Sequence, residues 1–423
     1  MRSSLRLMSN LLMIIVLFLI LYAYAMFQGG FVSWFLFFSF FPIILFQIGL
    51  LFYPMNRWKV SRNLTYHSIQ AGDSRVITIQ IERFIPFPLF YCMIEDMLPH
   101  SLQKIDSHYK KYTYLNTPEK LINQRNVKEM IFPWFRRKIK LSYTLDRIPR
   151  GEHKFASIKI QTGDFFGFVK KEHHYTVRDI LVAVPKQRDM LINDQFKRLD
   201  QDHITKHAWN TQKTNVSTGV REYIPGDKYS WIDWKQTARQ NTMMTREFER
   251  EKNIDTLLVL DRCDDQHLNQ LAFEGAVEVI YSMMMEIVKK SQQVNLLTIG
   301  SRAEHFSLLG DPATVEHVRQ YLARIQPEGT KTFSVQLYDE LVKLNRAFNV
   351  ILVVTNIEES FIQIIQQLKS QFTANRITVI MIQSQQQIRS RERHIIEQLQ
   401  LKGVHVDIFS ERELTQQKLE VNL

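Results

Sequence analysis

The sequence predicts a three-part protein: a transmembrane α-hairpin, then a β-sandwich-like domain, then a doubly wound α/β domain. Three patterns predict this fold class. No Asp, Glu, Lys or Arg occurs from Leu7 to Asn56. Apolar and polar residues alternate with period two between about residues 58 and 185. From Thr256 onward, continuous apolar strands alternate with amphipathic helices. At 423 residues, the chain can hold two or three domains, each with its own core.

Two apolar runs predict the hairpin, namely Leu11–Phe27 and Phe31–Tyr53, divided by Gln28-Gly29-Gly30. A helix needs about 20 such residues to cross a hydrocarbon core of about 30 Å, and Leu7–Asn10 can extend the shorter run. A signal peptide is one alternative, but it typically carries a single apolar segment of about 7–15 residues. A buried core hairpin is the other. The apolar surface all around both runs favours lipid.

Basic residues predict the orientation of this hairpin. Arg2 and Arg6 precede the first run, and Arg57, Lys59 and Arg62 follow the second, whereas the short connecting loop has no basic residue. Positively charged flanks stay on the cytoplasmic side of a membrane. We therefore expect a cell-membrane protein with two spanning helices, with both termini and the soluble domains in the cytoplasm.

The overall charge fits this location. The net charge of +11 and the pI near 9.4 favour attraction to the anionic headgroups of a lipid bilayer. No motif of interleaved basic and aromatic residues accompanies the charge, so a nucleic-acid partner is not predicted. The two cysteines, Cys92 and Cys263, are predicted to lie in different domains, which fits a reducing compartment.

The region from residue 57 to 188 is predicted to be β-sandwich-like. Strand-like alternation is clear at Val76–Ile81, Ile139–Tyr143 and Ile158–Gln161, and turn residues separate these segments. Between His100 and Arg137 the pattern weakens, which predicts a long excursion or an extra hairpin. The segment Phe165-Phe166-Gly167-Phe168 follows a turn signal. We predict that it plugs the core, with an exposed aromatic site as the alternative.

The segment from 256 to 423 predicts the α/β domain. Its strands are expected at Thr256–Leu260, Val294–Ile299 and Val350–Thr355, among others, with helices between them. Such continuous apolar strands form parallel sheets covered on both faces. Ligands of these sheets bind beyond the carboxyl ends of the strands, where Asp261 and Asn356 are expected. The predicted domains are therefore residues 1–56, 57–188, a motif block with its linker at 189–255, and 256–423.

The motif block is the least regular part of the sequence. Its residues from Gly219 to Arg239 combine two aspartates, two tryptophans, two arginines and a Pro-Gly turn, at spacings that neither a plain helix nor a plain strand would produce. Pro and Gly at the two corners predict a type II turn. On a strand, Asp233 and Lys235 would share a face. If a helix begins at Trp234 instead, Lys235 and Arg239 align at i, i+4.

This block resembles the bacterial "domain of unknown function 58" family. The family pattern reads approximately G-x-R-E-Y-x-P-G-D followed by I-x-W-x-x-S-A-R, and Thr237 stands here for the usual Ser. The matching residues are Gly219, Arg221, Glu222, Tyr223, Pro225, Gly226, Asp227, Ile232, Trp234, Lys235, Ala238 and Arg239. The upstream Arg150-Gly151 and the Asp164, Phe166-Gly167 step are similar to that family as well. The resemblance implies a MoxR-type AAA+ ATPase partner, in assembly or envelope-stress functions.

Three interpretations of the block remain open. Arg221, Lys235 and Arg239 are suited to a docking or anion-binding surface. Alternatively, the arginines and carboxylates form an internal network that ties the block to the next domain. In the third interpretation, Asp227 and Asp233 form the acid–base pair of an envelope-associated enzyme, although no nucleophile or substrate is placed beside them.

The C-terminal domain resembles a von Willebrand factor type A domain, which usually carries an Asp-x-Ser-x-Ser metal motif, a loop Thr and a later Asp. The candidate metal ligands here are Asp261, Cys263, Asp265, Thr330 or Thr332, and Asn356. Mg²⁺ requires hard oxygen ligands, and this set replaces one with the sulfur of Cys263 and loses a charge at Asn356. The resemblance therefore implies a degenerate site: we expect the adhesion-like fold without a cofactor, with Mg²⁺ as the alternative. No G-x-x-x-x-G-K-[ST] loop occurs, which disfavours ATP hydrolysis by this chain.

Together these patterns predict a membrane-anchored cytosolic interaction or adaptor protein without enzymatic activity. A purely structural scaffold and the enzyme that uses Asp227 and Asp233 are the alternatives.

Overall fold

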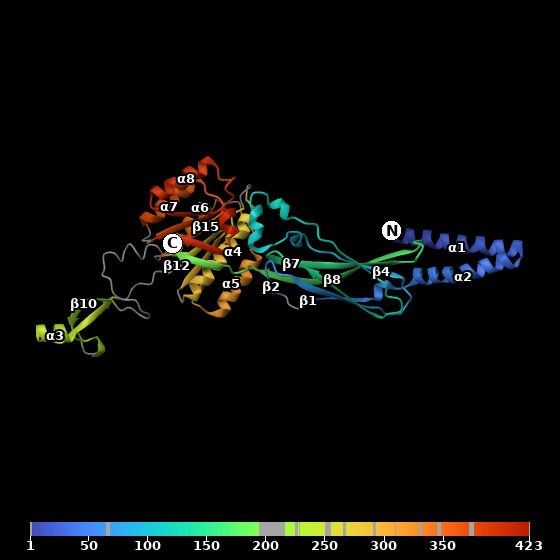
Figure 1. Cartoon of the computed structure of the whole chain (residues 1–423), viewed down its shortest axis with the longest axis horizontal. Coiled ribbons are helices and arrows are strands. Elements are labelled where there is room, and N and C mark those ends of the chain that lie inside the picture. The colour runs from blue at the N-terminus through green and yellow to red at the C-terminus, as the bar shows by residue number, and fades with distance from the viewer. Residues whose placement is uncertain are drawn as a thin grey trace.

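The chain forms three regions in a computed structural model (Figure 1): N-terminal apolar helices, a sheet-rich domain and an α/β domain. The structure describes residues 2–64, 68–193, 216–224, 227, 229–249, 255–264, 268–290, 293–308, 310–329, 332–344, 348–371 and 376–422.

The N-terminal region consists of α1 (Arg2–Gln28) and α2 (Phe31–Phe52), which pack side by side. The ring of Phe37 lies 5.7 Å from that of Phe18 and 6.0 Å from that of Tyr22. Among the described residues, only α2 is both long and apolar enough to cross a membrane, since the described apolar part of α1 is shorter. Only 28 % of the most apolar window of α2 is buried, so most of its surface is left uncovered. Length and composition are thus compatible with a membrane anchor.

The sheet-rich domain contains two sheets that share one hydrophobic core. Side chains such as Ile79 of one sheet and Ile160 of the other belong to the same buried cluster. The three-stranded sheet has the order β1-β3-β6, and the five-stranded sheet has the order β2-β8-β7-β4-β5. The strands are β1 (Lys59–Leu64), β2 (Ser68–Gln70), β3 (Arg75–Glu82), β4 (Tyr91–Asp96), β5 (Val127–Ile131), β6 (Lys138–Leu145), β7 (Gly151–Gly163) and β8 (Lys170–Val184). Their alternating burial, strict in β6, follows from the period-two sequence pattern.

One basic residue assigned to the membrane flank is buried instead. The guanidinium of Arg62 donates to both carboxylate oxygens of Asp96, at 2.5 and 3.0 Å, and to Asp179 at 3.0 Å. Arg62 therefore holds β1 to the other sheet. Sequence reasoning counted it as a flanking charge because its partners lie 34 and 117 residues further along the chain.

The prediction that residues 165–168 plug the core is wrong. Phe165, Phe166 and Phe168 are 79, 56 and 45 % exposed. They form the turn between the two longest strands, β7 and β8, at the tip of a hairpin that reaches the N-terminal helices (Figure 1). The turn lies beyond the edge of the core, so its aromatic side chains cannot fold back into it.

The α/β domain is built on a six-stranded sheet of order β14-β13-β12-β15-β16-β17, parallel except for β14. Its strands are β12 (Thr256–Asp261), β13 (Val294–Ile299), β14 (Ala303–Leu308), β15 (Asn349–Val354), β16 (Arg376–Ile382) and β17 (His405–Phe409). The order of connection reverses at β12, because β13 lies on one side of it and β15 on the other. In such sheets, this reversal opens a crevice at the carboxyl ends of the strands.

Helices cover both faces of this sheet. One buried cluster joins the sheet to α4 (Gln270–Lys289) and α5 (Pro312–Arg324). A second cluster on the other face contains side chains of α6 (Phe333–Leu344), α7 (Glu359–Gln371) and α8 (Ser390–Leu401). The predicted strands and helices of this half are confirmed within one or two residues.

Two long-range connections join the domains. The segment predicted as an excursion forms η2 (His100–Leu102), η3 (His108–Tyr114) and η4 (Pro118–Leu121), and Tyr112 from η3 lies fully buried in the α/β core. In addition, β9 (Asp189–Asn193) pairs in parallel with β18 (Lys418–Asn422), beyond the short α9 (Glu411–Leu414). Neither strand was predicted.

Candidate functional site

Three places in the structure concentrate polar and charged side chains: the motif block, the crevice at the sheet edge and the junction between the two soluble domains. The first two contain the residues singled out from the sequence. The third was not predicted, although its Arg150 belongs to the upstream segment that resembles the family.

The motif block folds as a small module around a two-stranded antiparallel sheet of β10 (Val216–Glu222) and β11 (Met244–Glu249). Between the strands lie η7 (Tyr229–Trp231) and α3 (Trp234–Gln240). A helix, not a strand, therefore begins at Trp234, because Asp233 caps it by accepting from the backbone N–H groups of Lys235 and Gln236. Figure 1 shows β10 and α3 at the opposite end of the molecule from α1 and α2.

Asp227 and Asp233 each have an arginine partner inside the block. Asp227 accepts from Arg221 Nη2 at 2.8 Å and from the backbone N–H of Ile224 at 3.2 Å. Asp233 accepts from Arg246 Nε at 3.2 Å. The arginine hydrogen bond lowers the pKa of Asp227, and the α3 N–H groups, first that of Gln236, lower the pKa of Asp233. Both groups are therefore carboxylates at neutral pH and hold no proton to donate.

The exposed face of the block is aromatic and basic. Tyr229 and Trp234 are 75 and 66 % exposed, while Ile232, which lies between them in the sequence, is buried. Lys235 and Arg239 are exposed and lie one helical turn apart on α3. Of the remaining motif residues, Glu222 ends β10 and Tyr223 follows it. Gly219 lies at an irregularity in the pairing of β10, and Pro225 and Gly226 lie outside the described residues.

The crevice collects most of the candidate metal residues. A pocket of about 100 Å³ at the carboxyl edge of the sheet is lined by Asp261, Cys263, Thr332 and Asn356, together with Asp264 and Glu358 among others. Asp265 and Thr330 lie outside the described residues. The structure thus brings Asp261 and Asn356 to the same edge, as expected from the ends of β12 and β15.

The chemistry of this pocket differs from that of a Mg²⁺ site. Asp261 Oδ1 accepts from the backbone N–H of Cys263 at 2.9 Å. Burial, together with the nearby Asp261, raises the pKa of Cys263 to about 12, so its sulfur is a neutral thiol. In the part of the chain that the structure describes, no three His, Cys, Asp or Glu side chains converge as a metal-ligand group. The described residues do not fit the octahedral oxygen shell of Mg²⁺.

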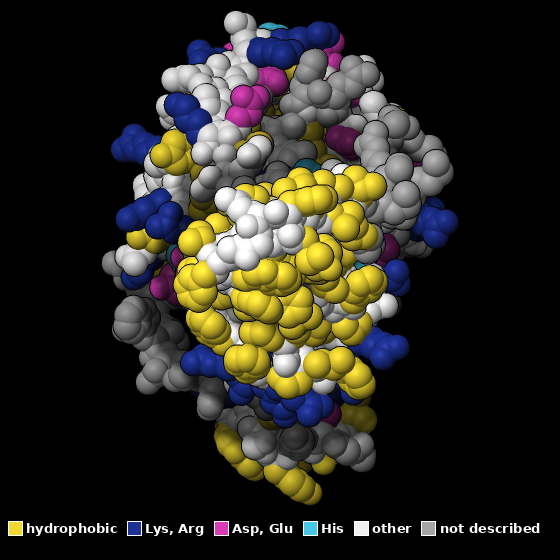
Figure 2. All heavy atoms as spheres, turned by 90° about the vertical axis from the view of Figure 1, so that its right-hand side faces the viewer, with side chains coloured by type: hydrophobic (Ala, Val, Ile, Leu, Met, Phe, Trp, Pro, Cys, Tyr) yellow, Lys and Arg dark blue, Asp and Glu magenta, His cyan; other side chains and the backbone are white. Residues whose placement is uncertain are grey.

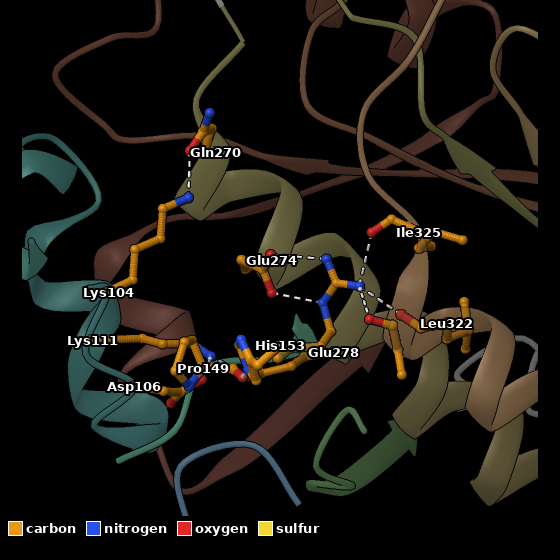
Figure 3. A network of polar contacts seen from close by, with 12 residues as sticks. Lys104, Asp106, Lys111, Pro149, His153, Gln270, Glu274, Glu278, Leu322 and Ile325 are labelled. Atoms are coloured by element: carbon orange, nitrogen blue, oxygen red, sulfur yellow. Dashed lines mark hydrogen bonds and ion pairs between the residues drawn. The ribbon is translucent and has the colours of Figure 1, made fainter. Parts of the chain in front are cut away.

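The junction between the two soluble domains carries a buried polar network (Figure 3). Arg150 forms a bidentate pair with Glu274 of α4, at 2.7 and 2.8 Å, and donates to the carbonyl oxygens of Leu322 and Ile325 at 2.6 and 3.0 Å. The first carbonyl lies in the last turn of α5, and the second belongs to the residue that directly follows this helix. One arginine of the sheet-rich domain therefore holds the ends of two α/β helices.

A second charge cluster in the same network surrounds Lys111 of η3. Its ammonium contacts Asp106 at 2.7 Å and also contacts Glu278 of α4, with all three side chains buried. Burial alone would lower the pKa of Lys111, but the two carboxylates raise it well above its ordinary value. Sequence reasoning missed this cluster, because Glu278 follows Lys111 by 167 residues. The one available signal was a charged residue on the apolar helix α4.

Two comparisons with known proteins concern this architecture. Residues 219–391, which include part of the motif block and most of the α/β domain, match the family described as "Protein of unknown function DUF58". The chain is 29 % identical over 390 residues to "Uncharacterized protein YeaD" of Bacillus subtilis (strain 168), with 92 % of each protein covered.

A solved structure has a much weaker likeness. The CARDB domain of the PF1109 protein of Pyrococcus furiosus, solved in complex with di-metal ions, is 7 % identical, with a TM-score of 0.19. The match covers 30 % of this chain and 94 % of that chain. At that score the likeness carries no structural argument.

Proposed function

We propose that this protein is a membrane-anchored cytosolic adaptor of the "domain of unknown function 58" type, which docks a partner through its motif block. The family match and the YeaD relative support the membership. The observation that carries the docking role is the exposure of Tyr229 and Trp234 on a module whose Asp227 and Asp233 are paired with its own arginines. Exposed aromatic residues beside basic ones are typical centres of binding energy.

In this proposal α1 and α2 both cross the bilayer as a hairpin. The hydrophobic side chains exposed on both helices support it, for example Leu19 and Phe38, at 55 and 62 %. The exposed basic residues Arg57 and Lys59 directly after α2 support a cytoplasmic side for the soluble domains.

The α/β domain in this proposal is a degenerate relative of the von Willebrand factor type A domain, and the sheet-rich domain is β-sandwich-like. The antiparallel edge strand β14 and the crevice at the reversal of strand order support the first assignment. The crevice is then a second recognition surface rather than a metal centre.

The partner that we propose is a MoxR-type AAA+ ATPase, on the basis of the resemblance of the motif block. Lys235 and Arg239 suit an acidic surface on that partner, because exposed basic residues steer oppositely charged proteins into contact. The enzyme alternative has less support, since the lowered pKa values of Asp227 and Asp233 leave neither available as a general acid. The scaffold alternative predicts no partner.

A binding experiment tests the proposal. The full chain in detergent should copurify with the MoxR-type ATPase of the same organism in the presence of nucleotide. The double variant Tyr229→Ser/Trp234→Ser should weaken binding by about 30-fold, as expected for a loss of about 2 kcal/mol at an interface centre. The matched control is Leu401→Ser, which removes an even more exposed apolar side chain at the end of α8. The proposal would be contradicted if the wild type did not copurify with the ATPase, or if the double variant bound the ATPase as tightly as the wild type.

A further inference from the structure

The turn between β7 and β8 exposes three phenylalanine side chains to solvent. Asp164 Oδ1 accepts from the backbone N–H of Val169 at 2.6 Å, and Gly167 has a φ of +78°, so the turn is closed tightly. The ring of Phe166 lies edge-on to that of Phe165, with centroids 5.6 Å apart, and stacks on that of Phe168 at 6.1 Å. We call residues 165–168 the aromatic tip.

Such a tip is unfavourable in water. Full burial of a phenylalanine side chain stabilises it by about 1.5–3 kcal/mol relative to exposure, and the aromatic tip leaves three of them at the end of the longest hairpin of the domain. A contiguous exposed apolar surface of this kind marks an interaction site.

The aromatic tip lies beside the C-terminal part of α2. Asp164, which precedes it, faces the side-chain amide of Gln47 of α2 at 3.5 Å. Just after the tip, the ammonium of Lys171 donates to the carbonyl oxygens of Leu51 and Tyr53, which end α2. Gln47 lies five residues before the end of α2, which corresponds to about 8 Å along the helix axis. The hairpin is therefore fixed at a constant height relative to α2.

Two further loops of the sheet-rich domain reach the same end. The pairing of Tyr91 with Gly163 and of Leu89 with Trp134 brings the segments after β3 and β5 beside the turn of β7 and β8. These segments expose Phe84, Phe132 and Phe135. Apolar side chains of three loops thus surround α2 where it leaves the domain.

A margin of positive charge accompanies this apolar surface. Exposed basic side chains adjoin it at Arg57, Arg136, Arg137 and Lys170. Figure 2 looks onto this end of the molecule, with α1 and α2 toward the viewer: hydrophobic side chains cover the centre of the face, and Lys and Arg side chains lie around it. Apolar residues rimmed by Lys and Arg are the pattern of a surface that lies in the boundary of an anionic bilayer, about 5–10 Å deep.

We propose that the aromatic tip is a second membrane contact, which inserts Phe165, Phe166 and Phe168 into the headgroup–acyl boundary of the bilayer that α2 spans, with Lys170 and Arg136 facing anionic headgroups. This inference rests on the proposed membrane anchor. The tip adjoins α2, whose exposed apolar surface lies in lipid in the proposed anchor, and this selects lipid over a protein partner. Its consequence is a soluble part that is held against the membrane at two points and cannot pivot on α2.

The test places an environment-sensitive fluorophore on the tip in the full chain. The variant Phe166→Cys in a Cys263→Ser background is labelled with a nitrobenzoxadiazole probe and reconstituted into vesicles of equal parts phosphatidylcholine and phosphatidylglycerol. Cys92 remains unlabelled because it is fully buried. The matched control is Ile180→Cys, on the same hairpin but far from the turn and 47 % exposed. A third probe, at Phe38→Cys, reports on α2 itself.

The expected result is a blue-shifted emission at position 166 that is quenched by lipids with a nitroxide high on the acyl chain, and no quenching at position 180. Vesicles of phosphatidylcholine alone should quench position 166 less, because the basic margin loses its anionic partners. Quenching at position 38 without quenching at 166 would overturn the inference and leave the anchor intact. Absence of quenching at both would refute the anchor. A blue shift at 166 without lipid quenching would show that protein covers the tip, and would also overturn the inference.

Discussion

Arginine–carboxylate pairs hold together both the domain junction and the motif block, but they do so in opposite surroundings. At the junction, Arg150 is 1 % exposed and pairs with a glutamate that follows it by 124 residues. In the block, Arg221 is 36 % exposed and pairs with Asp227, six residues away. The first kind of pair fixes two domains relative to each other, whereas the second closes a local loop. The comparison shows that a buried arginine–carboxylate pair can fix two domains rigidly, whereas the same pair in an exposed position only shapes a local surface.

The largest expected loss of stability is at the junction, for the variant Lys111→Ala. Removal of this ammonium leaves Asp106 and Glu278 buried without their cation, which costs about 3–5 kcal/mol. Chemical denaturation of the full chain in detergent measures it. Lys110→Ala removes an exposed lysine from the same helical segment and should leave the midpoint unchanged. Equal stability of the two variants would show that the buried cluster contributes nothing to the stability of the fold, and would contradict the contrast between the junction and the block.

A smaller loss of stability, which depends on pH, is expected for the variant Glu274→Gln. Burial alone would raise the pKa of Glu274, but Arg150 lowers it below its ordinary value. The stabilisation is therefore fully present above the unfolded pKa of about 4.3 and is lost as pH falls through the lower folded pKa. The denaturation midpoints of the wild type and of Glu274→Gln should differ at pH 7 and converge in acid. A difference that stays constant with pH would show that the carboxylate charge is irrelevant to the junction.

The smallest effect on global stability is expected in the block, with Asp233→Asn. This change weakens the cap of α3 and the pair with Arg246, but both partners lie within the block. Amide hydrogen exchange should therefore speed up over α3, while the melting temperature of the chain stays close to that of the wild type. Asp311→Asn, at the N-cap of α5, offers a matched cap in a helix that packs on the α/β core. If Asp233→Asn lowered the melting temperature strongly and Asp311→Asn did not, the block would unfold together with the rest of the chain, against this prediction.

The parts of the fold that follow a local period could be predicted from the sequence. Val294–Ile299 was predicted with the bounds that β13 has, and the predicted Val350–Thr355 is displaced by one residue from β15. The end of β12 at Asp261, and hence the crevice, followed from the same pattern. Such elements are encoded by spacing within a few turns or strands, so a single segment contains the whole signal.

The contacts that join distant segments could not be predicted in this way. The partners of Lys111 and Arg62, and the pairing of β9 with β18, depend on which surfaces meet after folding. Whether Phe165 and Phe166 face the core or the solvent also could not be predicted from their local sequence. A phenylalanine-rich turn has the same composition whether it faces a core or the outside, and only its position beyond the last core residue decides between them.

The pairing of β9 with β18 sets an order in which the molecule can be completed. These strands are separated by more than 220 residues, so β9 leaves the ribosome long before its neighbour has been made. At a synthesis rate of about 5–20 residues per second, the wait lasts roughly 10–45 s. During that time the sheet-rich domain can fold, while the edge of β9 stays unpaired and open to wrong strands. A cell that translates faster shortens this interval, and one that stalls within the α/β domain prolongs it.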